Sequence, residues 1–499
     1  NPNNLIYGTY TFSTEERTGA IGMPGFNISN WPQMSRTSKR NGSALTLRYQ
    51  RVFGPRLVSE TSAGYTYFPE RDVVPESELR KNQRAHVGYA LSQFSPEANP
   101  LNIIPAALFG GIPNAANLAV ERRLPQAANQ GFATLVSTLS YTPSGHLFKL
   151  GVYVERAWRN SFNPAYFNGL FDFSRNPSNP LDTGYAYANA ALGVFSSYTE
   201  DTRRIWYRMR SSSLEWFVQD SWKVKPRLTL ELGVRFYKVE PQYDATGNIS
   251  GFLPERYDPA QRPGLLRPVR VGNERLAEHP VTGERFPSAL IGAIAPGVGN
   301  PDNGLVVPAN DPSLPRALAR DPGVRAAPRF GFAWDVFGKG KTAIRSGFGV
   351  FYAYDQERQT SWFIGQAPLV RSPIVYFGRM ATLLVSQGHL FPPSVTTREL
   401  RDQLPTTMNF SFSIQQDLGA GVLAEVAYVG SLGRHLWRRR DMNWIPLGAN
   451  FRPENQDPSA PGSPLPSSFL RPFIGFAQIP LIEYAATSNY HSMQLTVNR

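Results

Sequence analysis

The chain has 499 residues, with 51 Lys or Arg against 38 Asp or Glu, so its formal net charge is +13. It contains no cysteine, which excludes disulfide frameworks, thiolate metal sites and cysteine nucleophiles. No stretch approaches the ~20 apolar residues of a membrane-spanning helix, so a large, basic chain remains, rich in Gly (42), Pro (43) and aromatic residues (12%).

Strands of about ten residues, alternating apolar and polar side chains, are predicted along the whole chain. In residues 226–236, for example, Leu228, Leu230 and Leu232 share one face. In chain order we expect about 12 strands, at residues 4–12, 44–53, 56–68, 132–141, 147–156, 213–222, 226–236, 329–336, 342–352, 408–418, 422–430 and 489–498.

Short turns alternate with long connections between these strands. The short turns are rich in Gly, Pro or Lys, as tight hairpins require, and lie at 54–55, 142–145, 223–226, 337–341 and 419–421. The long connections cover residues 69–131, 157–212, 238–328, 353–407 and 431–488. If neighbouring strands run antiparallel, all short turns lie at one end and all long connections at the other. This layout predicts an all-β, transmembrane antiparallel β-barrel with long extracellular loops in a bacterial outer membrane.

The placement of charged residues agrees with a membrane barrel. Apolar faces such as Phe330, Phe332 and Trp334 are almost free of charge, with Arg51 and Asp220 as exceptions close to turns. The alternate positions of these strands face the lumen, and the charged side chains there are Glu155, Glu231, Arg235, Asp335, Arg345 and Glu425. Aromatic residues near the short turns, as in an interfacial girdle, are Phe53, Tyr141, Trp222 and Phe337.

The structural alternative is a soluble all-β protein with long loops. Its strands would also alternate, because their apolar face would pack into a protein core. Sandwiches, however, have turns every 8–12 residues at both ends. Propellers repeat at about 40–50 residues, whereas the centres of these hairpins lie roughly 80–115 residues apart. The membrane barrel is therefore the favoured interpretation.

Several hairpins resemble a known family. Residues 217–222 read Phe-Val-Gln-Asp-Ser-Trp and lead into Leu-Thr-Leu-Glu-Leu-Gly-Val-Arg-Phe at 228–236, which resembles the hallmark hairpin of TonB-dependent outer-membrane transporters. Residues 328–352 are similar to a second hairpin of that family. Residues 426–436 and 489–495 resemble its Oar-like branch, which bears an N-terminal carboxypeptidase-regulatory-like domain.

The resemblance implies a barrel of ~22 strands around an N-terminal plug, driven by a TonB-type energy-transducing protein. No plug, TonB-binding box or aromatic-ending terminal strand is found in this sequence. The chain begins without a start methionine and stops inside an alternating run. We therefore expect residues 1–499 to be one partial outer-membrane barrel domain, about half of the barrel, with the plug and N-terminal domains lying outside it.

Candidate catalytic chemistry is scarce. None of the six histidines has a second histidine or a carboxylate at helical metal spacing, and no Gly-x-Ser-x-Gly elbow or phosphate-binding glycine loop is found. We expect no catalytic residues, no cofactor and no metal site. Oxygen-rich residues between Pro301 and Asp311 could hold Ca²⁺, but their spacing is that of ordinary turns, and calcium binding by the loops stays open.

Two basic, partly aromatic runs lie where strands leave the apolar band. They are residues 434–440, Arg-His-Leu-Trp-Arg-Arg-Arg, and residues 203–210, which hold Arg203, Arg204, Arg208 and Arg210. Such runs suit the phosphates of outer-membrane lipopolysaccharide or simply a solvated loop base. Nucleic-acid binding is disfavoured, because the runs follow the strand pattern.

We therefore expect a TonB-dependent receptor that takes up a large or scarce nutrient of unknown identity. Lumen-facing residues predicted to contact the cargo or the plug are Glu215, Gln219, Arg227, Glu231, Arg235 and Arg345. The alternative is a non-energised porin or an adhesive surface barrel, and a soluble carbohydrate-active β protein is a third interpretation.

Overall fold

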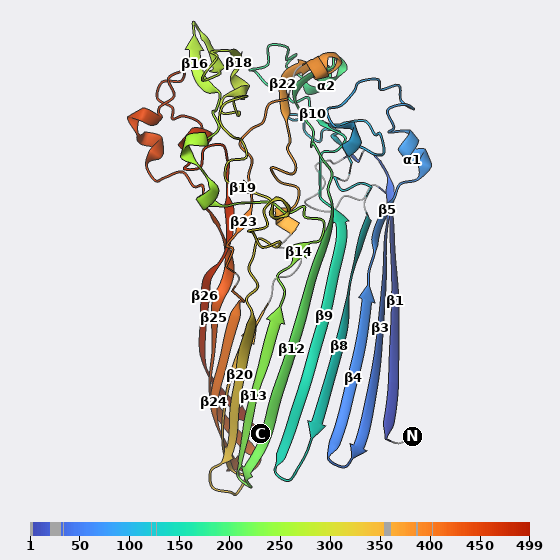
Figure 1. Ribbon diagram of the computed structural model, residues 1–499, viewed down its shortest axis with the longest axis vertical. Helices are drawn as coiled ribbons and strands as arrows, with labels where there is room; N and C mark the ends of the chain where they lie inside the picture. The colour runs from blue at the N-terminus through green and yellow to red at the C-terminus, as the bar shows by residue number, and fades with distance from the viewer. Residues whose placement is uncertain are drawn as a thin grey trace.

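Twelve long strands form one antiparallel wall in the structure, a computed structural model that describes residues 3–19, 31–32, 34–120, 122–125, 127–353, 361–385, 388–401 and 403–499. The strands are β1 (Asn4–Gly19), β3 (Arg36–Gly54), β4 (Leu57–Tyr67), β8 (Ala127–Tyr141), β9 (His146–Phe162), β12 (Trp206–Lys225), β13 (Leu228–Val239), β20 (Val324–Asp335), β21 (Thr342–Tyr352), β24 (Thr406–Gly419), β25 (Val422–Asp441) and β26 (Pro480–Asn498). Each pairs with the next in this order (Figure 1), which confirms the twelve predicted strands and their alternating connections.

Side chains that face each other across an antiparallel ladder lie on the same face of the sheet, so the register defines both faces. One row joins Leu139, Leu150, Val218 and Val234 on four neighbouring strands. From Leu232 on β13, three further strands, β20, β21 and β24, continue this apolar face with Phe330, Phe348 and Phe410 in register. The predicted apolar face is therefore continuous across the sheet.

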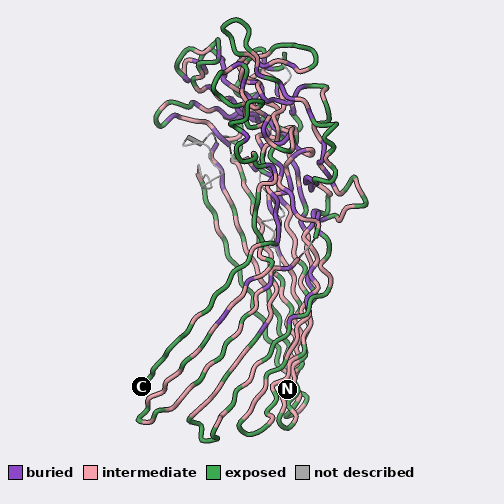
Figure 2. The backbone as a smooth tube through the Cα atoms, turned by 90° about the vertical axis from the view of Figure 1, so that its left-hand side faces the viewer, coloured by how far each residue is buried: buried purple, intermediate pink, exposed green. Residues whose placement is uncertain are grey.

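The lower half of the wall has no protein core on either face. Buried residues gather in the loop region, whereas the lower strands carry intermediate and exposed residues (Figure 2). Large apolar side chains such as Leu150 and Val218 are 48% and 40% exposed. Because a row of exposed apolar side chains is stable only against an apolar surrounding, this face of the sheet is suited to lipid.

The two charged exceptions on the apolar face are both compensated near the short turns. Asp220 forms a hydrogen bond with His146, with Nδ1 2.8 Å from Oδ2, and the imidazole stacks between the rings of Phe148 and Trp222. The guanidinium of Arg51 lies 4.6 Å from the centre of the Phe53 ring. Both charged side chains therefore lie close to the short turns, near the membrane interface, as predicted.

The five short turns lie at one end of the wall, where both chain ends also lie (Figure 1). Three of the hairpins close with a register shift or a bulge, for example between Lys223 and Lys225. Within the described residues β1 pairs only with β3, and no ladder joins β1 to β26. A two-residue strand pairs with Leu481 and Ile482 of β26, so the edge at β1 and most of the edge at β26 are open there.

The long connections form small sheets and cores above the wall. Their strands are β2 (Trp31–Pro32), β5 (Glu70–Val73), β6 (Ala106–Leu108), β7 (Leu118–Ala119), β10 (Leu170–Asp172), β11 (Val194–Thr199), β14 (Tyr243–Asp244), β15 (Gly251–Phe252), β16 (Arg267–Val271), β17 (Glu274–Glu278), β18 (Arg285–Pro287), β19 (Leu305–Val306), β22 (Ile374–Arg379) and β23 (Thr397–Arg398). Six of them, β2, β7, β6, β10, β11 and β22, form one mixed sheet from four different connections, whereas β5, β14 and β23 pair with strands of the wall. The described parts of the long connections are thus joined to one another and to the wall.

Helices are few and short: α1 (Glu76–Arg80), α2 (Ala186–Ala191) and α4 (Ser467–Leu470). Among the described residues no helix has the length and apolar character to cross a membrane.

Candidate functional site

The polar side chains of the alternating strands lie on the inner face of the wall. Its centre is an ion pair between Glu215 on β12 and Arg235 on β13, in which Nε and Nη2 of the arginine both lie 2.6 Å from Oε2 of the glutamate. The Ser213 hydroxyl donates to Oε1 at 3.1 Å, and Glu215 is only 4% exposed. The guanidinium lies 5.6 and 5.5 Å from the ring centres of Phe217 and Tyr237, so both charges are held in fixed positions.

Two further predicted residues lie close to this pair. Gln219 and Arg235 line a shallow hollow with Phe217, Gly233 and Arg329. Glu231 lies nearer the short turns, where it accepts a hydrogen bond of 2.6 Å from the Ser221 hydroxyl. These residues form a polar strip along two neighbouring strands.

The other two predicted residues lie apart from that strip. Arg345 is exposed in the middle of β21, in register with Ala333 and Ser413. Arg227 lies in the short turn between β12 and β13, against Gly338 of the next turn. Five of the six predicted residues therefore share one side of the sheet, whereas Arg227 lies in a turn, and the six do not form a single site.

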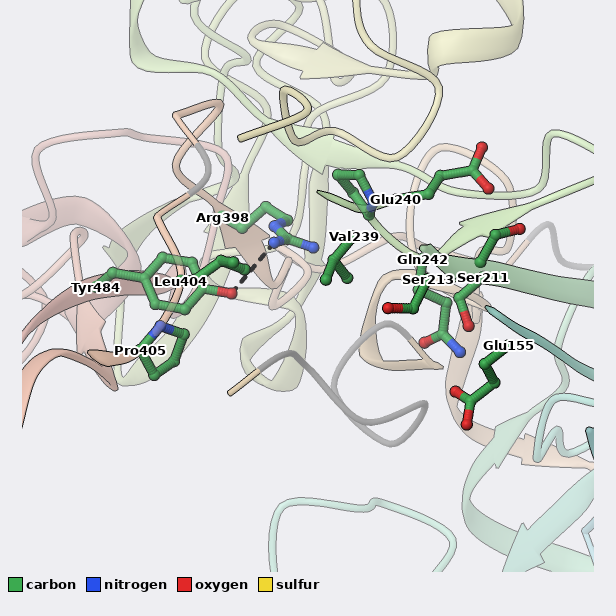
Figure 3. A pocket seen from close by; sticks show the side chains of 12 residues that line it. Glu155, Ser211, Ser213, Val239, Glu240, Gln242, Arg398, Leu404, Pro405 and Tyr484 are labelled. Carbon is green, nitrogen blue, oxygen red and sulfur yellow. Dashed lines mark hydrogen bonds between the residues drawn. The ribbon is translucent and has the colours of Figure 1, made fainter. Parts of the chain in front are cut away.

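A pocket lies higher, where the wall meets the loops. Glu155 on β9 and Ser211 to Ser213 on β12 form one side, and Arg398 on β23 and Tyr484 on β26 form the other (Figure 3). Arg398 donates a hydrogen bond of 3.3 Å to the Tyr484 hydroxyl. In the sheet, β12 and β26 are separated by five strands, so the wall curls until its two sides approach across the inner face.

Sequence reasoning missed Arg398 and Tyr484, since neither lies in a recognisable motif. A second, larger hollow shares both residues and adds Glu399, Arg401 and Gln403. The mouth of the barrel thus offers two arginines, a phenol and a glutamate within neighbouring hollows. Such groups can hydrogen-bond polar or anionic cargo.

A hydrophobic core of loop residues lies above this pocket. Met209 on β12 and Ile482 on β26 are 0% and 1% exposed, because they pack in one cluster with Leu318 and Phe363 from two different connections. Further members of the cluster are Ile205, Tyr207, Ile249, Leu253, Val306, Ile364 and Val370. The loops therefore bridge the two sides of the curled wall.

Buried carboxylates hold the loop layer together. Glu200, which is fully buried, accepts hydrogen bonds from the backbone N–H groups of Phe94 and Ser95 and from the Tyr198 hydroxyl. Burial, together with the neighbouring Glu200 charge, raises the pKa of Tyr198 well above its usual value. Tyr198 therefore stays neutral and donates its hydroxyl proton to Glu200.

The oxygen-rich stretch considered for Ca²⁺ is engaged in turns and ion pairs. Asp311 accepts hydrogen bonds from the Ser313 N–H and hydroxyl and pairs with Arg256 at 3.1 Å, and Asp302 pairs with Arg371. In the described parts of the chain, no three His, Cys, Asp or Glu side chains are grouped to hold a metal ion. Turn chemistry accounts for this stretch.

Comparison with known proteins gives one family over the whole chain. The family model described as an outer membrane beta barrel domain matches residues 1–499. No match is found among the curated proteins.

Solved structures with some similarity include the outer membrane transporter YddB from Escherichia coli, with a TM-score of 0.47 and 10% identity over 100% of this chain and 43% of that one. The copper transporter OprC gives a TM-score of 0.40 and 10% identity, covering 100% of this chain and 48% of that one. The siderophore receptor PirA from Acinetobacter baumannii gives 0.38 and 10%, covering 93% and 42%. This chain spans less than half the length of each of these proteins.

Proposed function

The chain belongs to the outer membrane β-barrel domain family of the bacterial outer membrane, and we propose that it is part of a TonB-dependent receptor that takes up a large or scarce nutrient. The hairpin motifs at residues 217–236 and 328–352 support this proposal through their resemblance to that family of transporters. The cargo would meet the Arg398 and Tyr484 pocket first and the polar strip of Glu215, Gln219 and Arg235 afterwards.

The observation that carries the proposal is the loop core over the mouth. A passive porin needs a water-filled path, whereas here Met209 and Ile482 from two sides of the wall meet in one apolar cluster. Opening such a cluster exposes apolar surface to water and therefore costs free energy. A closed mouth of this kind favours gated uptake.

The remainder of the barrel is also part of the proposal. Unpaired strand edges are costly in lipid, because the backbone N–H and C=O groups find no water there. The open edges at β1 and β26 would be paired by strands outside residues 1–499, in a barrel of ~22 strands. The plug and the contact with a TonB-type protein would likewise lie outside this stretch.

Two measurements on the full-length protein test the proposal. In planar lipid bilayers bathed in KCl, the wild type is expected to show no steady conductance, and steady porin-like channels would overturn gated uptake. The purified periplasmic domain of the TonB-type protein is expected to bind the full-length protein. Absence of binding would favour a non-energised or adhesive barrel.

A further inference from the structure

Three arginines project from the outer face of the wall just above its apolar band. They are Arg156 on β9 and Arg208 and Arg210 on β12. In register, Arg156 faces Ser212 and Arg210 faces Trp158, so Arg156 is the diagonal neighbour of Arg210. These even-numbered positions share the outer face with Val154 and Leu214, which are exposed on the apolar band.

The alternate residues on β12 show that this face points outward. Tyr207 and Met209 are buried in the loop core, whereas Arg208 between them is exposed. Above the band the strand therefore keeps its alternation but exchanges the chemistry of its faces: apolar residues point inward and arginines point outward.

The three arginines begin at the headgroup layer of a membrane and extend above it. A tilted barrel strand rises about 2.5 Å per residue along the barrel axis. Counted from Leu214, the uppermost position of the apolar band on β12, Ser212 and its partner Arg156 lie about 5 Å higher, Arg210 about 10 Å higher and Arg208 about 15 Å higher. The headgroup layer extends about 5–8 Å beyond the hydrocarbon, and the sugars of a glycolipid extend further.

No carboxylate neutralises these three guanidinium groups within the described residues. Arg156 donates to the Ser212 hydroxyl and Arg210 to the Asn160 side-chain oxygen, both at 2.8 Å. Asp244, whose charge acts on Arg210, forms no ion pair with the three guanidinium groups; it accepts from the Arg208 backbone N–H, the Thr246 hydroxyl and the Asn248 N–H. The positive charge is therefore available to an external anion.

Aromatic side chains flank the cluster at the same level. Tyr65 on β4 and Trp158 on β9 lie with ring centroids 5.7 Å apart, and Trp158 is in register with Arg210. Amphipathic rings at this depth are typical of the membrane interface. They give a lipid-anchored ligand an apolar border beside the charges.

Four other arginines of the two basic runs are already engaged. Glu483 accepts from both Arg438 and Arg440, and the Arg439 guanidinium lies 4.9 Å from the centre of the Trp362 ring. Arg204 is held over Phe162 at 3.6 Å while it donates to the carbonyl groups of Arg123 and Pro125. Within the described residues, Arg156, Arg208 and Arg210 lie together on the outer face without an ion pair, directly above the apolar band.

We propose that Arg156, Arg208 and Arg210 form a binding site for the phosphate groups of a phosphorylated glycolipid in the outer leaflet. Guanidinium groups bind phosphate oxygens in pairs, which gives geometry as well as charge attraction. The acyl chains of the same lipid would lie along the apolar band below, beside Val154 and Leu214. This inference rests on the orientation in the proposed function, with the loops outside, but not on transport.

The test is titration of the full-length protein, in a neutral detergent, with lipid A carrying two phosphates. R156Q/R210Q is expected to weaken binding about 30-fold, from roughly 1 kcal/mol for each basic residue near an anionic surface. The matched control K223Q/K225Q removes two exposed charges at the short turns and is expected to change binding by less than about twofold.

Three results would overturn the site: unchanged binding in R156Q/R210Q, equal loss in the control, or equal binding of lipid A without phosphates. Retention of the heat-sensitive folded band on gels shows that the variants are folded. Lipid binding needs neither a closed channel nor a TonB-type partner. The lipid site and the uptake function can therefore be refuted independently. A conducting channel that still binds lipid A at these arginines would overturn uptake alone.

Discussion

The assignment of the two faces can be tested at one height with one pair of substitutions. Leu150 lies near the middle of the apolar band and is 48% exposed, in register with Leu139 and Val218. Thr138 on the neighbouring strand is in register with Gly151, the residue that follows Leu150, and so lies at the same height on the opposite face. Leu150→Arg would place a charge in lipid, and Thr138→Arg would place it on the inner wall.

The expected cost follows from the depth of each position. An arginine facing lipid at the midplane of a barrel costs about 2–4 kcal/mol, which is a change of about 30- to 1,000-fold in the folding equilibrium. On the inner face, Thr138→Arg is in register with Glu60 and is expected to change stability by less than about 0.5 kcal/mol.

The assay is folding of the full-length protein into phospholipid vesicles, followed over a urea titration by the shift of the unheated band on gels. The reasoning is refuted if Thr138→Arg destabilises the protein as much as Leu150→Arg, because the two faces would then have the same surroundings. Equal tolerance of both substitutions would likewise contradict a lipid-facing Leu150.

Three further predictions use the same folding assay or hydrogen exchange. Arg235→Met leaves the Glu215 carboxylate buried without its cation, so it is expected to cost about 3–5 kcal/mol, and E215Q/R235M is expected to regain most of that; equal losses would show that the pair is not coupled. Gly430→Ala would drive its new methyl group into the Phe410 ring and is expected to cost about 1–3 kcal/mol, whereas Gly347→Ala, whose methyl group would lie 3.6 Å from the Ser411 hydroxyl oxygen, should cost far less. Burial lowers the pKa of His389, against a weaker opposing effect of Glu284. Since the unfolded chain then binds more protons below about pH 6.5, β22, whose Ile374 exchanges backbone hydrogen bonds with His389, should lose exchange protection from about pH 7 to about pH 5. His389→Gln should abolish that loss, and an unchanged pH profile in the variant would rule out His389 as its source.

The strands were predictable where the surroundings of the two faces differ strongly. Lipid on one side and water on the other impose strict alternation, so β13 and β21 were found almost residue for residue. Above the apolar band the apolar residues of β12, Tyr207 and Met209, point inward and the polar residue Arg208 points outward. Because this reverses the pattern of the lower strand, the sequence did not predict the part of β12 that precedes residue 213. On β25 the strand continues past His435, whose positive φ of 53° accompanies a register shift that breaks the alternation.

The loop layer and the pocket were not predictable in the same way. Strand β11 is six residues long and pairs with β22, nearly 180 residues later in the chain, so its stability comes from distant partners rather than from a local pattern. Arg398 meets Tyr484 because β23, from a long connection, pairs in parallel with β26, where Arg398 is in register with Ile482. Both residues approach Glu155 and Ser211 because the wall curls. The Glu215 and Arg235 pair, by contrast, lies on adjacent strands of one hairpin, where parity alone predicts that both side chains face the same way.

The length of the central strands has a consequence for what reaches the protein first. Strands β12 and β25 each have 20 residues, whereas about 9–11 are enough to cross the hydrocarbon of a membrane. At about 2.5 Å per residue the excess raises the loops roughly 25 Å above the lipid surface. The upper wall therefore raises the loops carried by these strands through the layer of surface sugars. In the proposed receptor, cargo would then reach the loops from open solution rather than through that layer.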